Sequence, residues 1–385
     1  MNLQATEENN TNRPPVLGIT SETPLQLWEN QSYHSSLVSL TNGFLNDEQF
    51  ELVVLVLVYM LQLTNIVAFI GNSLNIAVFV KLGFSESSNI SLTALAASDL
   101  VCVVMSVWSN ICFLLSFEDV RLPFQVLNVS FLTSSTPYLF VGRTVAWITA
   151  FISFERCLCI LAPLKVKSLI TPKITSVVVL VITTLTFGPV LFIYLRYNFV
   201  WVLYLNATIL GVAPNDNAYF ILMEKIVLII CGGIQPVLAF SIVLVCTVFL
   251  VVQLRKISSW RKSVTSAKDQ WGQNSGKNLA SSSPAIAQDR ISQKEERLVR
   301  MVVVVATIFI VGFSPNCILL LCNFAFEEFS VYGEHRRIVI VCGLLSSLAQ
   351  GVSGSVNILI YYYMASKFRA ALRGLLGLDC QDQTR

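Results

Sequence analysis

The chain has 385 residues, of which 54% are hydrophobic and only 13% are charged. Soluble domains carry roughly 25% charged residues, so the charges here are too few to solvate a globule of this size. The 18 glycines and 12 prolines are ordinary for the length and exclude a collagen-like or disordered chain. The composition therefore excludes a soluble enzyme and predicts an integral membrane protein.

Seven apolar runs are each long enough to form a membrane-spanning helix. Such a helix needs about 20 mainly apolar residues to cross a hydrocarbon core of about 30 Å. The strands of a membrane β-barrel would instead be segments of about ten residues with alternating hydrophobicity. We therefore predict an all-α membrane protein, a seven-transmembrane helix bundle with spans at about 52–80, 90–116, 129–161, 174–195, 222–253, 298–325 and 338–364.

The distribution of Lys and Arg predicts the orientation of this bundle. With residues 1–51 outside, seventeen of these cations fall in the inner loops and tail and six on the outer side. Lys and Arg gather on the cytoplasmic side of membrane proteins. We predict a multi-pass plasma-membrane protein with an extracellular segment 1–51, a seven-transmembrane domain 52–364, and a cytoplasmic helix 8 and tail 365–385.

Two segments outside the spans have a composition of their own. Residues 1–51 are acidic and contain no apolar run, so we expect a disordered segment without a cleavable signal peptide. The long inner loop, about 256–293, is Ser-rich and basic, and its middle is predicted to be disordered. Sequons for N-glycosylation lie on the predicted outer side at Asn9, Asn30, Asn128 and Asn206.

Polar side chains and prolines recur at membrane depth, where a polar group is costly and therefore indicates a functional site. The first span contains GNSLN, the second LAASDL, and the third ends in FERCLCI. The fifth and sixth spans each carry a proline, and the seventh contains NILIY, followed by SKFR. The residues of this ordered set are Asn72, Asp99, Glu155, Arg156, Pro236, Phe313, Pro315, Asn357, Tyr361 and Phe368.

The ordered set resembles the motifs of the rhodopsin-like (class A) G-protein-coupled receptors over about residues 52–378. The FERCLCI run also resembles the divergent invertebrate peptide-type and chemosensory branches. The resemblance implies a receptor that binds an extracellular ligand, a neuropeptide or a chemosensory ligand, and activates a heterotrimeric G protein. It assigns Asn72 and Asp99 to a polar core, Pro236 and Pro315 to helix kinks, and Phe313 to the place of the usual Trp beneath the ligand. It assigns G-protein coupling to Glu155, Arg156, Asn357 and Tyr361.

The physical chemistry of these groups suggests two switches. Asn72 and Asn357 could bridge to the carboxylate of Asp99 through water, although a static polar clamp is the alternative. Arg156 could pair with Glu155 and with Glu295 or Glu296, which lie on the order of 30 Å inward of Pro315 along the sixth helix. We prefer Glu295. The alternative is a solvated charge run, because exposed ion pairs contribute only about 0–1 kcal/mol.

Several features of the resembled family are missing. Neither 128–135 nor 197–220 contains Cys, so the disulfide between the third helix and the second outer loop cannot form. Cys322 and Cys342 could form a substitute bridge, but we expect free thiols. Ile358 replaces the usual Pro after Asn357, and Val145 replaces a sodium-binding hydroxyl. Tyr138 replaces the Asp of amine receptors, and the lack of Lys in 338–364 excludes covalent retinal.

The candidate ligand-pocket residues are Tyr138, Arg143 and Glu224, with Phe313. Acidic outer segments would attract a basic peptide or a cationic small molecule, or they merely follow the inward bias of positive charge. Arg143 lies at mid-membrane depth. It could bind an anionic ligand group, but we favour an internal partner, either Glu224 or a backbone carbonyl.

The C-terminal tail is expected to lie on the membrane surface, and one alternative function remains open. The basic amphipathic stretch after Phe368 is typical of a helix on membrane lipid, and Cys380 is a palmitoylation candidate. The alternative function is a seven-span transporter or channel lined by Asp99 and Arg143. No enzyme is expected, because the chain has only two His and no catalytic set. We expect no cofactor, no metal and no nucleic-acid partner.

Overall fold

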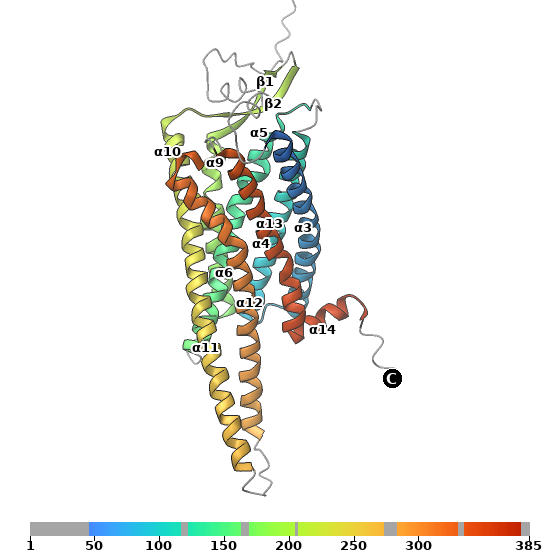
Figure 1. Ribbon diagram of the computed structural model, residues 1–385, viewed down its shortest axis with the longest axis vertical. Coiled ribbons are helices and arrows are strands. Elements are labelled where there is room, and N and C mark those ends of the chain that lie inside the picture. Colours follow the sequence, from blue (N-terminus) through green and yellow to red (C-terminus); the bar gives the residue numbers. More distant parts are fainter. Residues whose placement is uncertain are drawn as a thin grey trace, which may run out of the picture.

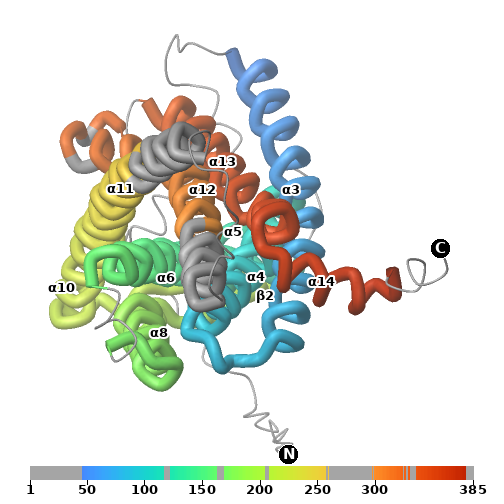
Figure 2. Tube along the Cα trace, turned by 90° about the horizontal axis from the view of Figure 1, so that it is seen from below, coloured from blue at the N-terminus to red at the C-terminus, as the bar shows by residue number. Residues whose placement is uncertain are grey.

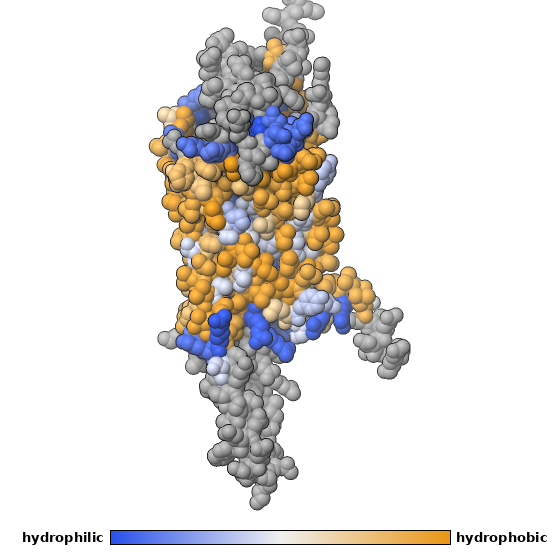
Figure 3. Space-filling view, viewed as in Figure 1, coloured by the Kyte–Doolittle hydropathy of each residue, from blue (hydrophilic) through white to orange (hydrophobic). Residues whose placement is uncertain are grey.

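The computed structural model describes residues 46–116, 122–162, 169–204, 207–272, 283–329 and 335–378. Within these ranges seven helical spans are long and apolar enough to cross a membrane, which confirms the predicted seven-transmembrane helix bundle. Figure 1 shows them side by side in one elongated bundle. Hydrophobic side chains cover the middle of the face seen in Figure 3, and hydrophilic ones lie at both ends.

The spans are built from helices whose bounds lie close to the predicted ones. The first two are α3 (Asp47–Leu82) and α4 (Ser87–Leu115), and the third joins α5 (Val126–Ser130), the π-helical turn η1 (Phe131–Ser135) and α6 (Thr136–Leu161). The fourth joins α8 (Pro172–Phe187) and α9 (Val190–Arg196), and the fifth joins α10 (Ala218–Val227), η2 (Leu228–Ile234) and α11 (Gln235–Gly272). The last elements are α12 (Ser283–Ala325), the short η3 (Glu327–Phe329), α13 (Arg336–Met364) and α14 (Ser366–Leu375).

Local sequence explains where several helices begin, end or bend. Asn46 caps α3, because its side chain accepts a hydrogen bond from the backbone of Gln49 (2.9 Å). Gly83 ends the same helix at a φ of 79°, which favours glycine. Pro189 separates α8 from α9, and Pro315 lies inside α12. A proline removes one backbone hydrogen bond and bends the helix.

The fifth and sixth helices extend further than predicted. The predicted fifth span ends near 253, whereas α11 continues to Gly272. The predicted sixth span begins near 298, whereas α12 begins at Ser283. No Pro or Gly interrupts 237–271 or 285–311, so nothing in the chain stops either helix once it has formed. Figure 1 shows the two helices projecting together beyond the bundle. Residues 273–282 lie outside the described ranges.

A β-hairpin lies at the opposite end of the bundle, where the sequence alone predicts only a loop. Strand β1 (Tyr197–Tyr204) pairs antiparallel with β2 (Ala207–Pro214). The signal was present, because both segments are rich in β-branched or aromatic residues and only two residues separate them. The hairpin is fixed to 122–125 by two backbone hydrogen bonds, Gln125 N to Leu210 O and Leu210 N to Pro123 O, each 2.8 Å.

The helices surround a shared core. α3 packs against α4, α13 and α14, and α6 packs against α4, α8, α11 and α12. Figure 2 shows this arrangement along the bundle axis. The core at the α14 end is apolar and tightly closed, with Val78, Ile148 and Leu250 fully buried. The polar residues of the sequence motifs lie beside or above this core, where the helices leave a cavity.

Candidate functional site: a central cavity and a charged pair

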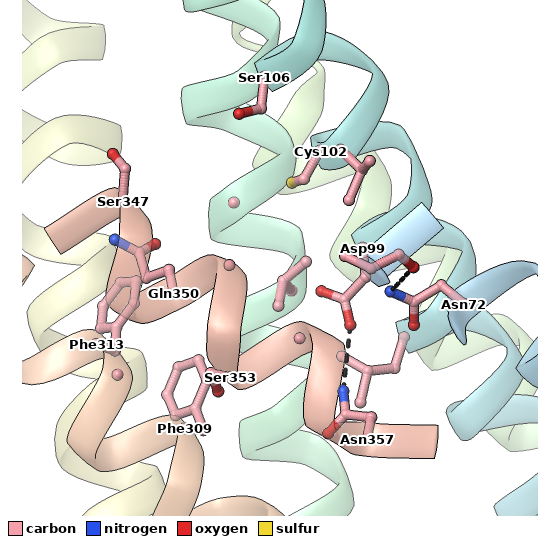
Figure 4. Close-up of a pocket in the computed structure, with 18 of the residues that line it drawn as sticks. Asn72, Asp99, Cys102, Ser106, Phe309, Phe313, Ser347, Gln350, Ser353 and Asn357 are labelled. Atoms are coloured by element: carbon pink, nitrogen blue, oxygen red, sulfur yellow. Dashed lines mark hydrogen bonds between the residues drawn. The ribbon is translucent and has the colours of Figure 1, made fainter. Parts of the chain in front are cut away.

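A cavity of about 80 Å³ lies inside the bundle. Roughly 10–15 Å³ of such space holds one water molecule, so the cavity accommodates several waters or part of a small ligand. Figure 4 shows its walls converging from several helices, with Asp99 and Asn72 on one side and Phe313 on the other. The residues that define its chemistry are Asn65, Asn72, Asp99, Tyr138, Phe313, Gln350 and Asn357.

The cavity brings the predicted polar core together. The side-chain amide of Asn357 donates to Asp99 Oδ2 at 3.4 Å. Asn72 donates instead to the carbonyl of Ala68 (3.0 Å) and accepts from Asn75 (3.4 Å). Asn72, Asp99 and Asn357 nevertheless line one space. Asn357 thus contacts the carboxylate directly, whereas any link from Asn72 to it has to pass through the cavity.

Stacked aromatic rings close one wall of the cavity. Phe313 stacks on Phe309, with ring centroids 5.1 Å apart, and lies 6.4 Å from the ring of Phe240 on α11. Just before Phe313, Gly312 brings α12 very close to α13: a Cβ there would lie 2.9 Å from Ala349 O and from Ser353 Cβ. This aromatic wall therefore adjoins a very close contact between α12 and α13.

Of the candidate ligand residues, Tyr138 and Phe313 line the cavity, and Arg143 and Glu224 do not. Arg143 is buried and its Nε donates to the carbonyl of Cys231 at 3.0 Å. That carbonyl lies in the π-helical turn η2. Of the two internal partners considered for Arg143, the structure therefore has the backbone carbonyl.

Glu224 belongs to a polar cluster at the hairpin end. It accepts hydrogen bonds from Arg196 Nε (3.2 Å) and from the Tyr197 hydroxyl (2.7 Å). Arg196 also donates to the carbonyl of Asn215, on the far side of the hairpin. The cluster therefore ties both ends of the hairpin to α9 and α10.

The hairpin has no disulfide to the third span. Neither β1 nor β2 contains Cys, and Cys322 and Cys342 are free thiols. At the start of the third span Phe131 instead meets Tyr197 edge to face, with ring centroids 5.5 Å apart. This ring contact, the backbone bonds of Leu210 and the Glu224 cluster together form what we call the hairpin anchor.

The charged pair lies at the opposite end, on α6. Arg156 Nη2 and Glu155 Oε1 are 2.6 Å apart, and both residues are buried. Two serines at the start of α4 hold the pair: Ser87 Oγ donates to Glu155 Oε1 (3.0 Å), and Arg156 Nη2 donates to Ser88 Oγ (2.7 Å). We call these four residues the serine latch.

Sequence reasoning missed the serine half of this latch. The two serines belong to the polar run SESSN just before the second span. Serines at the start of a helix usually cap its backbone, so the run does not indicate a contact with another helix. The contact predicted between Arg156 and Glu295 involves side chains outside the described part of α12. Within the described residues, Glu155 Oε2 and Arg156 Nε are buried without a hydrogen-bond partner.

The remaining motif residues, Tyr361 and Phe368, pack in an aromatic cluster that joins α3, α13 and α14. Tyr361 is buried between Phe79 of α3 (5.4 Å) and Phe368 of α14 (5.6 Å). Phe368 and Leu372 form the buried side of α14, and Lys367 Nζ pairs with Glu86 at 2.7 Å. Pro236 is the second residue of α11, after η2 ends at Ile234. α14 is thus attached to the bundle through an aromatic cluster.

The predicted modification sites are only partly described. Asn128 lies on α5 near the hairpin and donates to the side chain of Gln125 at 2.7 Å. Asn9, Asn30, Asn206 and Cys380 lie outside the described residues.

A seven-helix bundle with a polar cavity near its centre and a buried Glu–Arg pair at one end has the architecture of a membrane receptor. The family described as "Serpentine type 7TM GPCR chemoreceptor Srw" matches residues 60–379, and the chain belongs to this family. It is a family of receptors and not of enzymes. No curated protein matches the chain significantly.

Proposed function

We propose that the protein is a plasma-membrane receptor that binds an extracellular ligand in the central cavity and activates a heterotrimeric G protein at the α14 end. The observation that carries the proposal is the composition of the cavity wall. Tyr138 and Phe313 share one space with Asp99 and Asn357. A ligand against the first pair therefore changes the surroundings of the second.

The cavity connects to the α14 end through two helices. α12 contains Pro315, three residues past the close contact of Gly312 with α13, and a proline inside a helix removes one backbone hydrogen bond there. α13 carries Asn357 at the cavity and Tyr361 in the aromatic cluster with Phe79 and Phe368. A ligand that separates α12 from α13 would move both helices at the α14 end, which is a rigid-body switch.

The serine latch supplies the second state of this switch. Its buried pair has unsatisfied atoms, Glu155 Oε2 and Arg156 Nε, among the described residues. Incompletely satisfied buried polar groups are costly, so the latched arrangement is only moderately favoured. A G protein that offers Arg156 a better acceptor would compete with Ser88.

The ligand that fits this cavity best is a small chemosensory molecule. A space of about 80 Å³ accommodates a compact molecule or one side chain of a peptide. A neuropeptide would have to bind mainly on the hairpin side of the cavity. Tyr138 and Phe313 offer aromatic faces, and Gln350 offers an amide, so an apolar molecule with one polar group suits the lining.

The orientation, modifications and lipid contacts are part of the same proposal. The hairpin end faces outward because most Lys and Arg lie in the segments toward the α14 end. Glycosylation at Asn9, Asn30, Asn128 and Asn206 is consistent with that side. Leu375, Leu376 and Leu378 are exposed beside the basic residues of α14, which suits contact with anionic lipid and palmitoylation of Cys380.

The test is a screen of odorant and peptide libraries on the protein expressed in cells with G-protein biosensors. We expect at least one compound to give a response that cells without the protein lack. A transporter or channel would instead give ligand flux or current without a biosensor response, and that result would overturn the proposal.

Releasing the serine latch is expected to raise basal signalling. The Ser88→Ala variant removes the hydroxyl that accepts from Arg156, and a hydrogen bond to a charged group contributes about 1.5–3 kcal/mol. We expect a severalfold higher ligand-free biosensor signal at equal surface expression. Ser85→Ala, at an exposed position two residues before Ser87, is the control and should match the wild type. Unchanged basal signal in both Ser88→Ala and the Ser87→Ala/Ser88→Ala double variant would contradict a restraining role.

A further inference from the structure

A second hollow lies between α3 and α4, on the side of the bundle that faces away from the other helices. Its volume is about 260 Å³, and its walls are formed by Asn65, Ile66, Phe69, Ile70, Val103, Val104 and Val107. Apart from Asn65, every lining residue is apolar. Ile66, Phe69, Ile70 and Val104 are 48–56% exposed. We call this hollow the membrane groove, because these exposed apolar residues lie in the middle of two membrane spans, where hydrocarbon is the solvent.

The membrane groove and the central cavity share a wall. Asn65 and Val103 line both spaces. Asn65 is buried, and its amide donates to Ser106 Oγ on α4 at 3.0 Å and to Gln62 Oε1 at 3.3 Å. Gln62 in turn donates to the carbonyl of Val107 at 3.4 Å. The two spaces therefore meet at Asn65 and Val103, and the hydrogen bonds of Asn65 and Gln62 join α3 to α4 at this wall.

Access to the central cavity from the hairpin end of the bundle is more restricted than access from the membrane groove. The hairpin anchor holds β1 and β2 at the end of the bundle through Phe131, Leu210 and Glu224. Figure 1 shows the hairpin lying across that end. A lipophilic solute is also more concentrated in the bilayer than in water, because each buried CH₂ group favours transfer by about 0.8 kcal/mol.

We propose that the membrane groove is a lateral entrance through which a lipophilic small molecule reaches the central cavity from the bilayer. Asn65 and Val103 form the gate, and the hydrogen bond from Asn65 to Ser106 holds it closed. The occupant is an uncharged molecule, because the groove lining contains no charged residue. A phospholipid acyl chain that rests in the groove without passing the gate is the competing occupant.

The proposal rests on the proposed function only in taking the central cavity as the ligand site. The path itself can be measured without ligand, G protein or signal. If no compound activates the receptor in the biosensor screen, the proposed function fails, but the measurement of the path remains valid. If compounds activate the receptor and the path is absent, the lateral entrance fails and the proposed function stands.

The test uses photoreactive probes on the full chain in membranes. One probe is a long-chain alkyl diazirine, which partitions into the bilayer, and the other is a short charged diazirine, which stays in water. Irradiation expels N₂ and leaves a carbene that inserts into a nearby side chain, and proteolysis with mass spectrometry locates the label. The reporters are Tyr138 and Phe313, which line the central cavity and not the membrane groove.

Three variants make the result specific. Val104→Trp places a large ring in the groove, so we expect the ratio of lipophilic to charged label at Tyr138 and Phe313 to fall severalfold. Val101→Trp is the matched control, since Val101 is also exposed on α4 but lies outside the groove, and should leave the ratio unchanged. Ser106→Ala removes the hydrogen bond that closes the gate and should raise the ratio by about fivefold.

Two outcomes would overturn the lateral entrance. A ratio that neither Val104→Trp nor Ser106→Ala changes would show that lipophilic molecules reach the cavity by another route. A label on Phe69 and Val107 that never reaches Tyr138 or Phe313 would show that the groove only holds an acyl chain.

Discussion

In cells with a G-protein biosensor, the Arg156→Ala variant is expected to lose the ligand response completely at unchanged surface expression. Arg156 is the cation of the serine latch, 2.6 Å from Glu155 Oε1 and 2.7 Å from Ser88 Oγ. A guanidinium offers five donors in a planar fork, and Ala offers none to an incoming G protein. The measurement is the biosensor response to a compound found in the library screen, compared with an epitope-tag measurement of surface protein.

The main risk in this experiment is that the variant fails to fold. Removing one partner of a buried ion pair can cost about 3–5 kcal/mol, because the other charge is left uncompensated. Arg156→Gln keeps a donor for Glu155 and serves as the second variant. Glu86→Ala breaks only the exposed pair with Lys367 and should respond normally. A full response in both Arg156 variants would exclude Arg156 from coupling.

The Gly312→Ala variant is expected to be markedly less stable than the wild type. The new Cβ would lie 2.9 Å from Ala349 O and Ser353 Cβ, a distance that only a shift of α12 against α13 can relieve. Overpacking of this kind costs about 1–3 kcal/mol. The measurement is the thermal unfolding midpoint of purified protein in detergent, which should fall by several degrees.

A second glycine provides the matched control. Gly142 lies on α6, and a Cβ there would have no atom within 4 Å. Gly142→Ala should therefore leave the midpoint equal or raise it, because Ala is more favourable than Gly in a helix by about 1 kcal/mol. Equal midpoints for Gly312→Ala and the wild type would mean that α12 and α13 separate easily, contrary to the close contact seen between them.

The spans could be predicted from sequence because a membrane imposes one strong requirement, a long apolar run, that local composition reveals directly. Asn72 and Asn357 were predicted to bridge to Asp99 through water because a buried carboxylate needs partners, whereas in the structure Asn357 donates to Asp99 directly at 3.4 Å. Glu155 and Arg156 were predicted as a pair because the end of the third span resembles the Asp/Glu-Arg motif of the receptor family. These predictions depend on short segments of sequence, or on the general requirement that a buried polar group has a partner.

The remaining features depend on how distant segments meet. Ser87 and Ser88 are 68 residues away from their partners Glu155 and Arg156, and nothing local distinguishes them from capping serines. Arg143 donates to the carbonyl of Cys231 in the π-helical turn η2, 88 residues further along the chain, so local sequence does not predict this contact. The central cavity and the membrane groove are spaces between helices, so they follow from packing and not from any single segment.

The hairpin anchor has a consequence for how access to the receptor depends on its chemical surroundings. It consists of ring contacts, hydrogen bonds and ion pairs, and the described cysteines near it are free thiols. Its formation requires no oxidant, and a reducing environment leaves it intact. The hairpin end of the bundle is therefore restricted by non-covalent contacts alone, and access from that side does not depend on the redox state of the surroundings.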